Sequence, residues 1–223
     1  MPPIVPHSFL FEFLPAIPRI DTLVKKNGVV ELPESSSVFV PSQLNSNQEA
    51  GPAPFQLRMA WNPDGLAVNV FVSGKKLAVE GRSADLKNSD YVSICIDTRH
   101  TADVHRATGY CTALAVVPVD SKSQGQPRII RLEIAQQRDS RHQLNPENCR
   151  AETVVTTDGY QLRVWLPSTE LPGFNEVAEI GRIGFYLVVH DSELGELPLS
   201  VGDDFPVSFD PSTWMPVTLV AEG

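Results

Sequence analysis

The sequence has few cysteines and few positive charges. Its 223 residues include three cysteines, an odd number without a Cys-x-x-Cys pair. An exported protein would keep one unpaired thiol, so we expect a reducing compartment. Cys95 and Cys111 fall within expected strands and are predicted to be buried and unreactive. The 18 Lys and Arg residues against 27 Asp and Glu residues give a net charge of −9, which disfavours a nucleic-acid partner.

Long apolar runs and helical periodicity are also missing. The apolar run Phe9–Leu14 contains Glu12 and stops at Pro15, which is typical of neither a signal peptide nor a membrane span. We therefore expect a cytoplasmic protein with no membrane partner. No segment keeps a 3.6-residue apolar period over three turns, so long helices are not expected; Ser168–Leu171 has room for one helical turn.

Alternation of apolar and polar residues, the pattern of β-strands, runs through most of the chain. The clearest hairpin joins strands Gln56–Trp61 and Leu66–Val72 through the turn sequence Asn62-Pro63-Asp64-Gly65. Lys26-Asn27-Gly28-Val29 is a second hairpin signal. Further strands are expected at Tyr91–Asp97, Tyr110–Val117, Arg128–Ile134, Ala151–Thr156, Tyr160–Leu166, Ile183–Val189 and Met215–Val220.

About nine or ten short strands without long helical connections predict an all-β fold. The expected architecture is a two-sheet antiparallel β-sandwich of jelly-roll-like form. The chain has no internal repeat and no linker composition. We therefore predict a single domain over residues 1–223, with an irregular lead-in over about residues 1–55.

Five groups of short motifs follow one another along residues 55–220. They are Met59–Leu66, Ser89–Asp97, Gly159–Leu162 with Leu166-Pro167, Ile183–Phe185 with Val189–Asp191, and Pro211–Trp214. Their order resembles the family 9 carbohydrate-binding modules and the wider DOMON-like group of β-sandwich domains. The resemblance implies a jelly-roll sandwich that binds sugars or chain ends between aromatic side chains, often with structural calcium. This chain departs from the sugar-binding members at Lys76–Arg82, where they usually offer a tryptophan and it has no aromatic residue.

Trp165 is the candidate ligand platform. It falls on the polar face of its strand with Gln161 and Arg163, and a flat ring between hydrogen-bonding side chains suits a saccharide. Packing of Trp165 against the edge of the second sheet or a loop is an equally good interpretation. The other two tryptophans are expected to be structural, with Trp61 in the core and Trp214 as a plug between the sheets.

The loop that follows Asp97 is the second polar cluster. Arg99, His105 and Arg106 are candidate contacts for a polar or anionic ligand. Asp97 and Asp103 are candidate oxygen ligands for calcium. No zinc spacing matches, and the neighbouring arginines would repel a cation, so ion pairing within an ordered surface loop is the simpler interpretation.

No enzyme motif is present: no Gly-x-Ser-x-Gly elbow, His-Glu-x-x-His pair, phosphate loop or dinucleotide fingerprint. The acidic loop Asp191–Glu196, continuing to Asp203-Asp204, has enough carboxylates for a glycosidase pair, but their separation is not readable from sequence. We predict a non-catalytic carbohydrate-binding-like module without a cofactor, recognising a saccharide or related polar ligand. The alternatives are a structural or protein-interaction sandwich that has lost sugar binding and, third, a glycoside hydrolase-associated domain.

Overall fold

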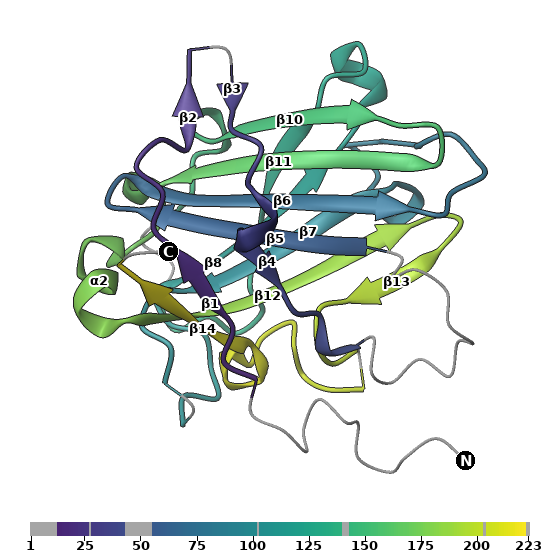
Figure 1. Ribbon diagram of the computed structural model, residues 1–223. Helices are drawn as coiled ribbons and strands as arrows, with labels where there is room; N and C mark the ends of the chain where they lie inside the picture. Colours follow the sequence, from purple (N-terminus) through teal and green to yellow (C-terminus); the bar gives the residue numbers. More distant parts are fainter. Residues whose placement is uncertain are drawn as a thin grey trace.

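Two β-sheets pack face to face in the computed structural model, which describes residues 13–26, 28–42, 55–101, 103–139, 143–202 and 204–221 (Figure 1). The seven-stranded sheet contains β1 (Ala16–Pro18), β7 (Tyr91–Asp97), β8 (Cys111–Val117), β9 (Arg128–Leu132), β12 (Arg182–Asp191), β13 (Gly195–Pro198) and β14 (Met215–Val220). The five-stranded sheet contains β4 (Ser37–Val38), β5 (Phe55–Asn62), β6 (Gly65–Ser73), β10 (Arg150–Val155) and β11 (Gly159–Pro167). A separate ribbon pairs β2 (Val24–Lys25) with β3 (Gly28–Val29).

The strand order is β1-β14-β12-β7-β8-β9 in the larger sheet, with β13 added on β12, and β10-β11-β6-β5-β4 in the smaller one. All neighbours are antiparallel except β1 and β14, which run parallel with Ile17 opposite Leu219. The expected all-β sandwich is confirmed.

The predicted number of strands is too low, because fourteen occur within the described residues. Most of the additional strands have two to four residues, too few to show alternation, and the lead-in expected to be irregular supplies β1 to β4. The β2–β3 ribbon forms where the Asn-Gly signal predicts a hairpin, although Asn27 itself lies outside the described residues.

Helices contribute little to the described part of the chain. The α-helix α2 has four residues, Val177–Ile180, and a 3-10 turn at Ser168–Glu170 occupies the place where one helical turn was expected. No helix there is long and apolar enough to cross a membrane.

The main core lies between the sheets. Alternate residues of each strand point inward, so Val70 of β6, Ile94 of β7 and Leu187 of β12 are fully buried in one cluster. Trp61 belongs to this core as predicted, and its indole N–H donates a hydrogen bond to the carbonyl of Val220 at 3.1 Å. Burial of these side chains is the main force that holds the sheets together.

The outer face of the seven-stranded sheet is partly covered by the segment 199–214. Ala113 of β8 and Val188 of β12 point away from the main core and form a second cluster with Val207 and Trp214. The indole N–H of Trp214 donates to the carbonyl of Val207 at 2.8 Å. Trp214 is therefore buried, but on the outer face of one sheet, and the expectation that it lies between the sheets is wrong.

The hairpin between β5 and β6 forms at the predicted turn, and its register depends on Gly65. The φ angle of Gly65 is +154°, and a Cβ atom there would lie 2.2 Å from the backbone oxygen of Leu166. Only glycine fits this position without a shift of β11. The turn therefore fixes both the hairpin and its contact with the next strand.

We expect Gly65→Ala to lower the free energy of unfolding by about 1–3 kcal/mol, because the new methyl group meets backbone atoms in a strained conformation. Gly202→Ala is the matched control, since a Cβ atom there meets nothing within 4 Å. Urea denaturation of both variants measures the difference. Equal midpoints would show that the turn tolerates a side chain.

Candidate functional site

Trp165 lies on the outer face of the five-stranded sheet, as its position in β11 predicts, but its ring is covered. Only 8 % of Trp165 is exposed, and it packs in a cluster with Leu23, Val29 and Leu32 of the lead-in. A saccharide therefore cannot stack on this ring while the lead-in is in place. The structure corrects the interpretation of Trp165 as an exposed platform.

The two polar neighbours of Trp165 are engaged under the same cover. The Arg163 guanidinium donates to Glu31 at 2.7 Å and to the side-chain oxygen of Gln161 at 3.1 Å. These contacts hold both side chains on the sheet surface, so Arg163 and Gln161 have a structural role here, although Arg163 Nε and Gln161 Nε2 are buried without a hydrogen-bond partner among the described residues.

We expect Trp165→Ala to destabilise the fold by about 3–5 kcal/mol, because it removes a large buried ring and leaves a cavity under the lead-in. Trp165→Phe keeps most of the apolar contact and should cost less. Urea denaturation gives both values. A Trp165→Ala variant of unchanged stability that has lost saccharide binding would restore the ring as the platform.

The predicted ligand residues in the loop after β7 contact different segments of the chain. Arg99 forms an ion pair with Glu176, and its guanidinium carbon lies 4.2 Å from the centre of the Tyr110 ring. The Nδ1 atom of His105 lies 3.3 Å from a carboxylate oxygen of Asp210. Each side chain ties the loop to a separate segment, which agrees with ion pairing in an ordered surface loop. The structure does not bring the two together in one site.

Arg106 has a different role. Its Nε–H donates to the backbone carbonyl of Gln136, a residue whose φ angle is +61°. A left-handed conformation costs a non-glycine residue about 1–2 kcal/mol, so it persists where the surroundings hold it. The hydrogen bond from Arg106 therefore stabilises the conformation of the segment around Gln136.

The described residues do not fit a structural calcium ion, which needs about six to eight oxygen ligands. Asp97 is buried at the end of β7, accepts the backbone N–H of Arg99 at 3.0 Å, and has a pKa raised by burial. Asp103 is exposed in the loop that follows. In the ranges that the structure describes, no three His, Cys, Asp or Glu side chains are grouped to hold a metal.

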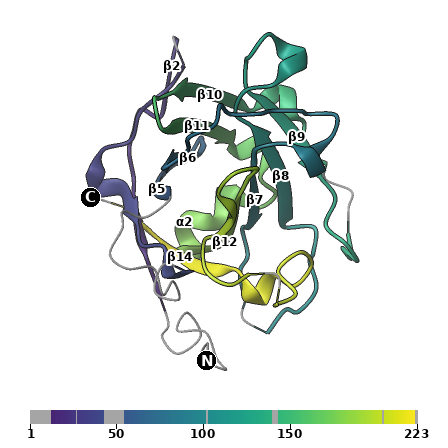
Figure 2. The same cartoon turned by 90° about the vertical axis from the view of Figure 1, so that its right-hand side faces the viewer.

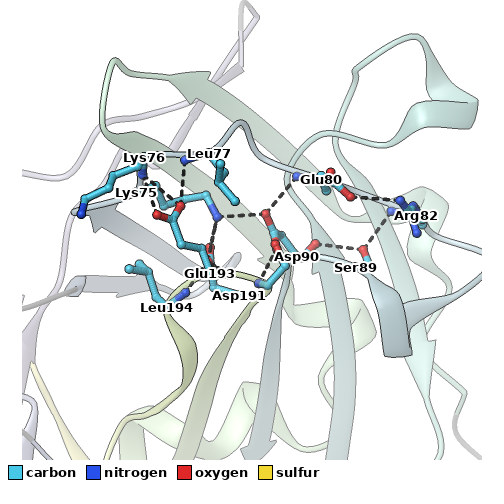
Figure 3. Close-up of polar contacts among 11 residues, drawn as sticks. Lys75, Lys76, Leu77, Glu80, Arg82, Ser89, Asp90, Asp191, Glu193 and Leu194 are labelled. Atoms are coloured by element: carbon cyan, nitrogen blue, oxygen red, sulfur yellow. Dashed lines mark hydrogen bonds and ion pairs between the residues drawn. The ribbon is translucent and has the colours of Figure 1, made fainter.

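A buried ion group joins three segments far apart in the sequence (Figure 3). Lys75 follows β6, Asp90 precedes β7 and Asp191 ends β12. The Lys75 ammonium lies 3.2 Å from Asp90 Oδ2 and 2.6 and 2.7 Å from the two oxygens of Asp191. All three side chains are almost completely buried. An ammonium group thus occupies the place between two carboxylates where a metal cation would have to bind.

Backbone donors complete the ion group. Asp90 accepts the N–H of Ser192 at 2.7 Å and that of Glu80 at 2.9 Å. Burial alone would raise the pKa of Asp90, but these backbone bonds and Lys75 hold it below its ordinary value. Burial likewise opposes the charge of Lys75, yet its hydrogen bonds to Asp191 and Asp90 raise its pKa above the ordinary value. The charged forms of both groups are therefore favoured.

Glu193 extends this network to the surface. Its carboxylate accepts the backbone N–H of Leu77 at 2.8 Å and that of Lys76 at 2.9 Å, and these bonds lower its pKa. Asp191 is held by Lys75, and Glu196 lies 3.0 Å from His190 Nδ1, so all three carboxylates of Asp191–Glu196 have partners within the chain. A glycosidase needs a free acid and a free base or nucleophile across a cleft, which these three do not supply. Asp203 lies outside the described residues.

We expect Lys75→Met to lower the free energy of unfolding by about 3–5 kcal/mol, because it leaves two buried carboxylates without a cation. The loss should shrink as the pH falls, since protonation of an orphaned carboxyl removes the uncompensated charge. Lys76→Met, at an exposed neighbouring position, is the control.

Urea denaturation across a pH series measures both variants. In the wild-type chain the contribution of Asp90 is lost as the pH falls through its lowered pKa, and that of Lys75 as the pH rises through its raised one. Equal stability of the two variants at neutral pH would contradict a structural role for the ammonium.

A groove follows β9, the outer edge strand of the seven-stranded sheet, as three successive hollows of about 290, 590 and 540 Å³. Polar residues of the first are Arg131, Glu133, Gln136, Gln137 and Gln143. Those of the second are Ser83, Lys122, Arg128, Arg131, Asn145 and Glu147. Those of the third are Lys26, Arg128, Glu147, Arg150 and Glu152. Neighbouring hollows share residues, so we treat them as one feature, the β9 groove.

The groove forms because β9 and β10 end their respective sheets and lie side by side at one margin of the sandwich (Figure 2). Ile129 of β9 and Ala151 of β10 turn toward the main core and give the groove an apolar floor. Pro146 contributes a further apolar surface between the two strands. At the far end, the side-chain amide of Gln137 donates to the carbonyls of Thr108 and Cys111 at 2.8 and 3.0 Å, which fixes that wall.

The groove offers binding chemistry and no visible nucleophile. Guanidinium, amide and carboxylate groups stand over apolar carbon, and none of the described residues that line it is aromatic. Cys111 borders the first hollow, but burial raises its pKa to about 12, and the pKa of Cys95 rises to about 12 for the same reason. Both thiols are therefore protonated at neutral pH, in agreement with the prediction that they are unreactive.

Sequence analysis identified β9 as a strand but missed the groove. One signal was available: the segment 122–150 holds six of the 18 Lys and Arg residues but three of the 27 Asp and Glu residues. The groove walls come from β9, β10 and the turns beside them, whose proximity depends on the packing of both sheets.

No protein family model matches the sequence, and no curated protein matches it. Solved structures do match. A family 9 carbohydrate-binding module from Caldicellulosiruptor kristjanssonii in complex with cellotriose is similar over 95 % of this chain and 95 % of its own, with a TM-score of 0.59 and 12 % identity. A structure of a family 9 module from the same organism in complex with glucose covers 93 % of this chain and 96 % of its own, with a TM-score of 0.56 and 12 % identity. The chain therefore has a fold like that of family 9 modules.

Proposed function

We propose that this chain is a non-catalytic saccharide-binding module whose ligand lies in the β9 groove. The observation that carries the proposal is the groove itself, where planar hydrogen-bonding side chains and apolar carbon line three adjoining hollows that share residues. Sugar hydroxyls both donate and accept hydrogen bonds, and guanidinium, amide and carboxylate groups match them in pairs. Similarity to modules solved with cellotriose and with glucose supports the same ligand class.

The geometry also favours a binding site at the β9–β10 edge over one on the outer face of either sheet. The ring of Trp165 is covered by the lead-in, and Trp214 is covered by the segment before β14. Aromatic stacking adds about 0.5–1.5 kcal/mol per ring beyond area burial, and the described lining of the groove has no ring to supply it. Binding should therefore be weak and depend mainly on hydrogen bonds.

The test is titration of the chain with cello-oligosaccharides and glucose, followed by NMR, which detects weak complexes. We expect shifts confined to the residues around β9 and an affinity reduced about tenfold in Arg131→Ala, because a charge-assisted hydrogen bond contributes about 1.5–3 kcal/mol. Arg19→Ala is the control, since Arg19 pairs with Asp21 on an exposed surface beside β1.

Two outcomes would contradict the proposal. One is the absence of any shift with a broad panel of neutral and charged saccharides. The other is a loss of affinity in Arg19→Ala as large as that in Arg131→Ala, which would place the ligand elsewhere or show a general charge effect.

One observation favours a protein-interaction role as the second candidate. Val154 and Val155, at the end of edge strand β10, are 47 % and 58 % exposed. An open strand edge with exposed valines is suited to pairing with another chain. A stable dimer in sedimentation, together with no saccharide binding, would favour this second function.

A further inference from the structure

The segment that builds much of the β9 groove has a charge opposite to that of the rest of the chain. Residues 122–150 contain six Lys and Arg and three Asp and Glu, a net charge of +3. The remaining residues contain 12 basic and 24 acidic side chains, a net charge of −12, and the two values add to −9. Four of the six basic residues of this segment, Lys122, Arg128, Arg131 and Arg150, line the groove.

Two cations of the groove differ from most other arginines in lacking an ion-pair partner, whereas a third, Arg131, pairs with Glu133 at 3.7 Å. Arg58, Arg99 and Arg163 each form an ion pair with a glutamate. Arg128 and Arg150 line the groove and form no ion pair or side-chain hydrogen bond with any residue that the structure describes. Both are exposed, so their guanidinium donors are available to a ligand.

The acidic groups in the two larger hollows do not cancel this charge. Lys26, Lys122, Arg128, Arg131 and Arg150 border these hollows together with two acidic residues, Glu147 and Glu152. A carboxylate oxygen of Glu152 already accepts the backbone N–H of Val29 at 3.1 Å. Glu147 is then the acidic group left facing the ligand in these two hollows, against Arg128 and Arg150, which have no ion-pair partner among the described residues.

We propose that the β9 groove binds an acidic saccharide, one that carries carboxylate or sulfate groups; this rests on the proposed saccharide-binding function. Guanidinium groups bind such oxyanions in a bidentate manner, and the residues of the first hollow remain for hydroxyl groups. Arg128 of β9 and Arg150 of β10 border the same hollow, so two guanidinium groups without an ion pair can meet one ligand.

A nucleic acid is the less suitable polyanion. The body of the protein outside the segment 122–150 is strongly acidic and would repel a long phosphate chain. Single-stranded nucleic acids also use aromatic stacking, and no aromatic side chain is among the described residues that line the groove. A short chain of uronic acids needs no aromatic stacking and extends less far over the acidic surface outside the groove.

The test compares polygalacturonate with a neutral cello-oligosaccharide of similar length, using the full chain and isothermal titration at low and high salt. We expect about tenfold tighter binding of polygalacturonate at low salt, an advantage that high salt removes. The double variant Arg128→Gln and Arg150→Gln should lose about tenfold for polygalacturonate and much less for the neutral chain. Lys87→Gln with Arg182→Gln, two exposed residues outside the groove, is the charge-matched control.

The outcomes separate the two proposals. Equal or better binding of the neutral chain overturns the acidic ligand and leaves the proposed function standing. Failure of both saccharides overturns both proposals. Binding of polyglutamate as tight as that of polygalacturonate, or an equal loss in the control variant, shows a general attraction of polyanions and overturns the assignment of an acidic saccharide.

Discussion

Both faces of both sheets carry apolar side chains that must be buried away from water. This constraint decides which part of the surface stays uncovered and accessible to a ligand. The inner faces bury each other, as in any sandwich. The outer faces need separate covers, which are the lead-in over Trp165 and, on the other sheet, residues 204–214, which include Trp214. Once these covers are in place, the open margin between β9 and β10 is where the described structure presents a long depression.

Charge joins the strands at one end of the sandwich, where β6 and β12 end and β7 begins. Loops at this end of the sandwich offer few apolar contacts, and the Lys75 ammonium with two aspartates holds them together instead. Backbone N–H groups complete the network. The Ser-Asp motif at the start of β7, one of the features behind the family resemblance, thus has a structural task here. Ser89 accepts the N–H of Arg82, and Asp90 accepts that of Glu80.

The long strands could be located from the sequence because their side chains alternate between a buried face and a second face. β7 and β14 begin and end where predicted, and the other long strands differ by a residue or two at most ends. Alternation also placed Trp165 on the correct face. Alternation could not show that the lead-in covers that face. Leu23 and Trp165 are far apart in the sequence and come into contact only in the folded structure.

The functional features were harder to predict for the same reason. Lys75 and Asp191 are separated by 116 positions, and no local pattern indicates that they meet. The β9 groove combines residues from two sheets, so the basic segment 122–150 does not by itself show which of its cations face a common depression. The candidates that the sequence did suggest around Asp97 proved to be linked to separate partners.

The parallel pairing of β1 with β14 has a mechanical consequence. Backbone hydrogen bonds join Pro15 to Thr218 and Arg19 to Val220 at the two ends of this pairing. The two ends of the described chain therefore lie on neighbouring strands that run in the same direction. A force that draws residue 13 away from residue 221 loads these hydrogen bonds together, in shear, rather than one after another. The sandwich would therefore resist tension at its edge strand before any load reached the core or the groove.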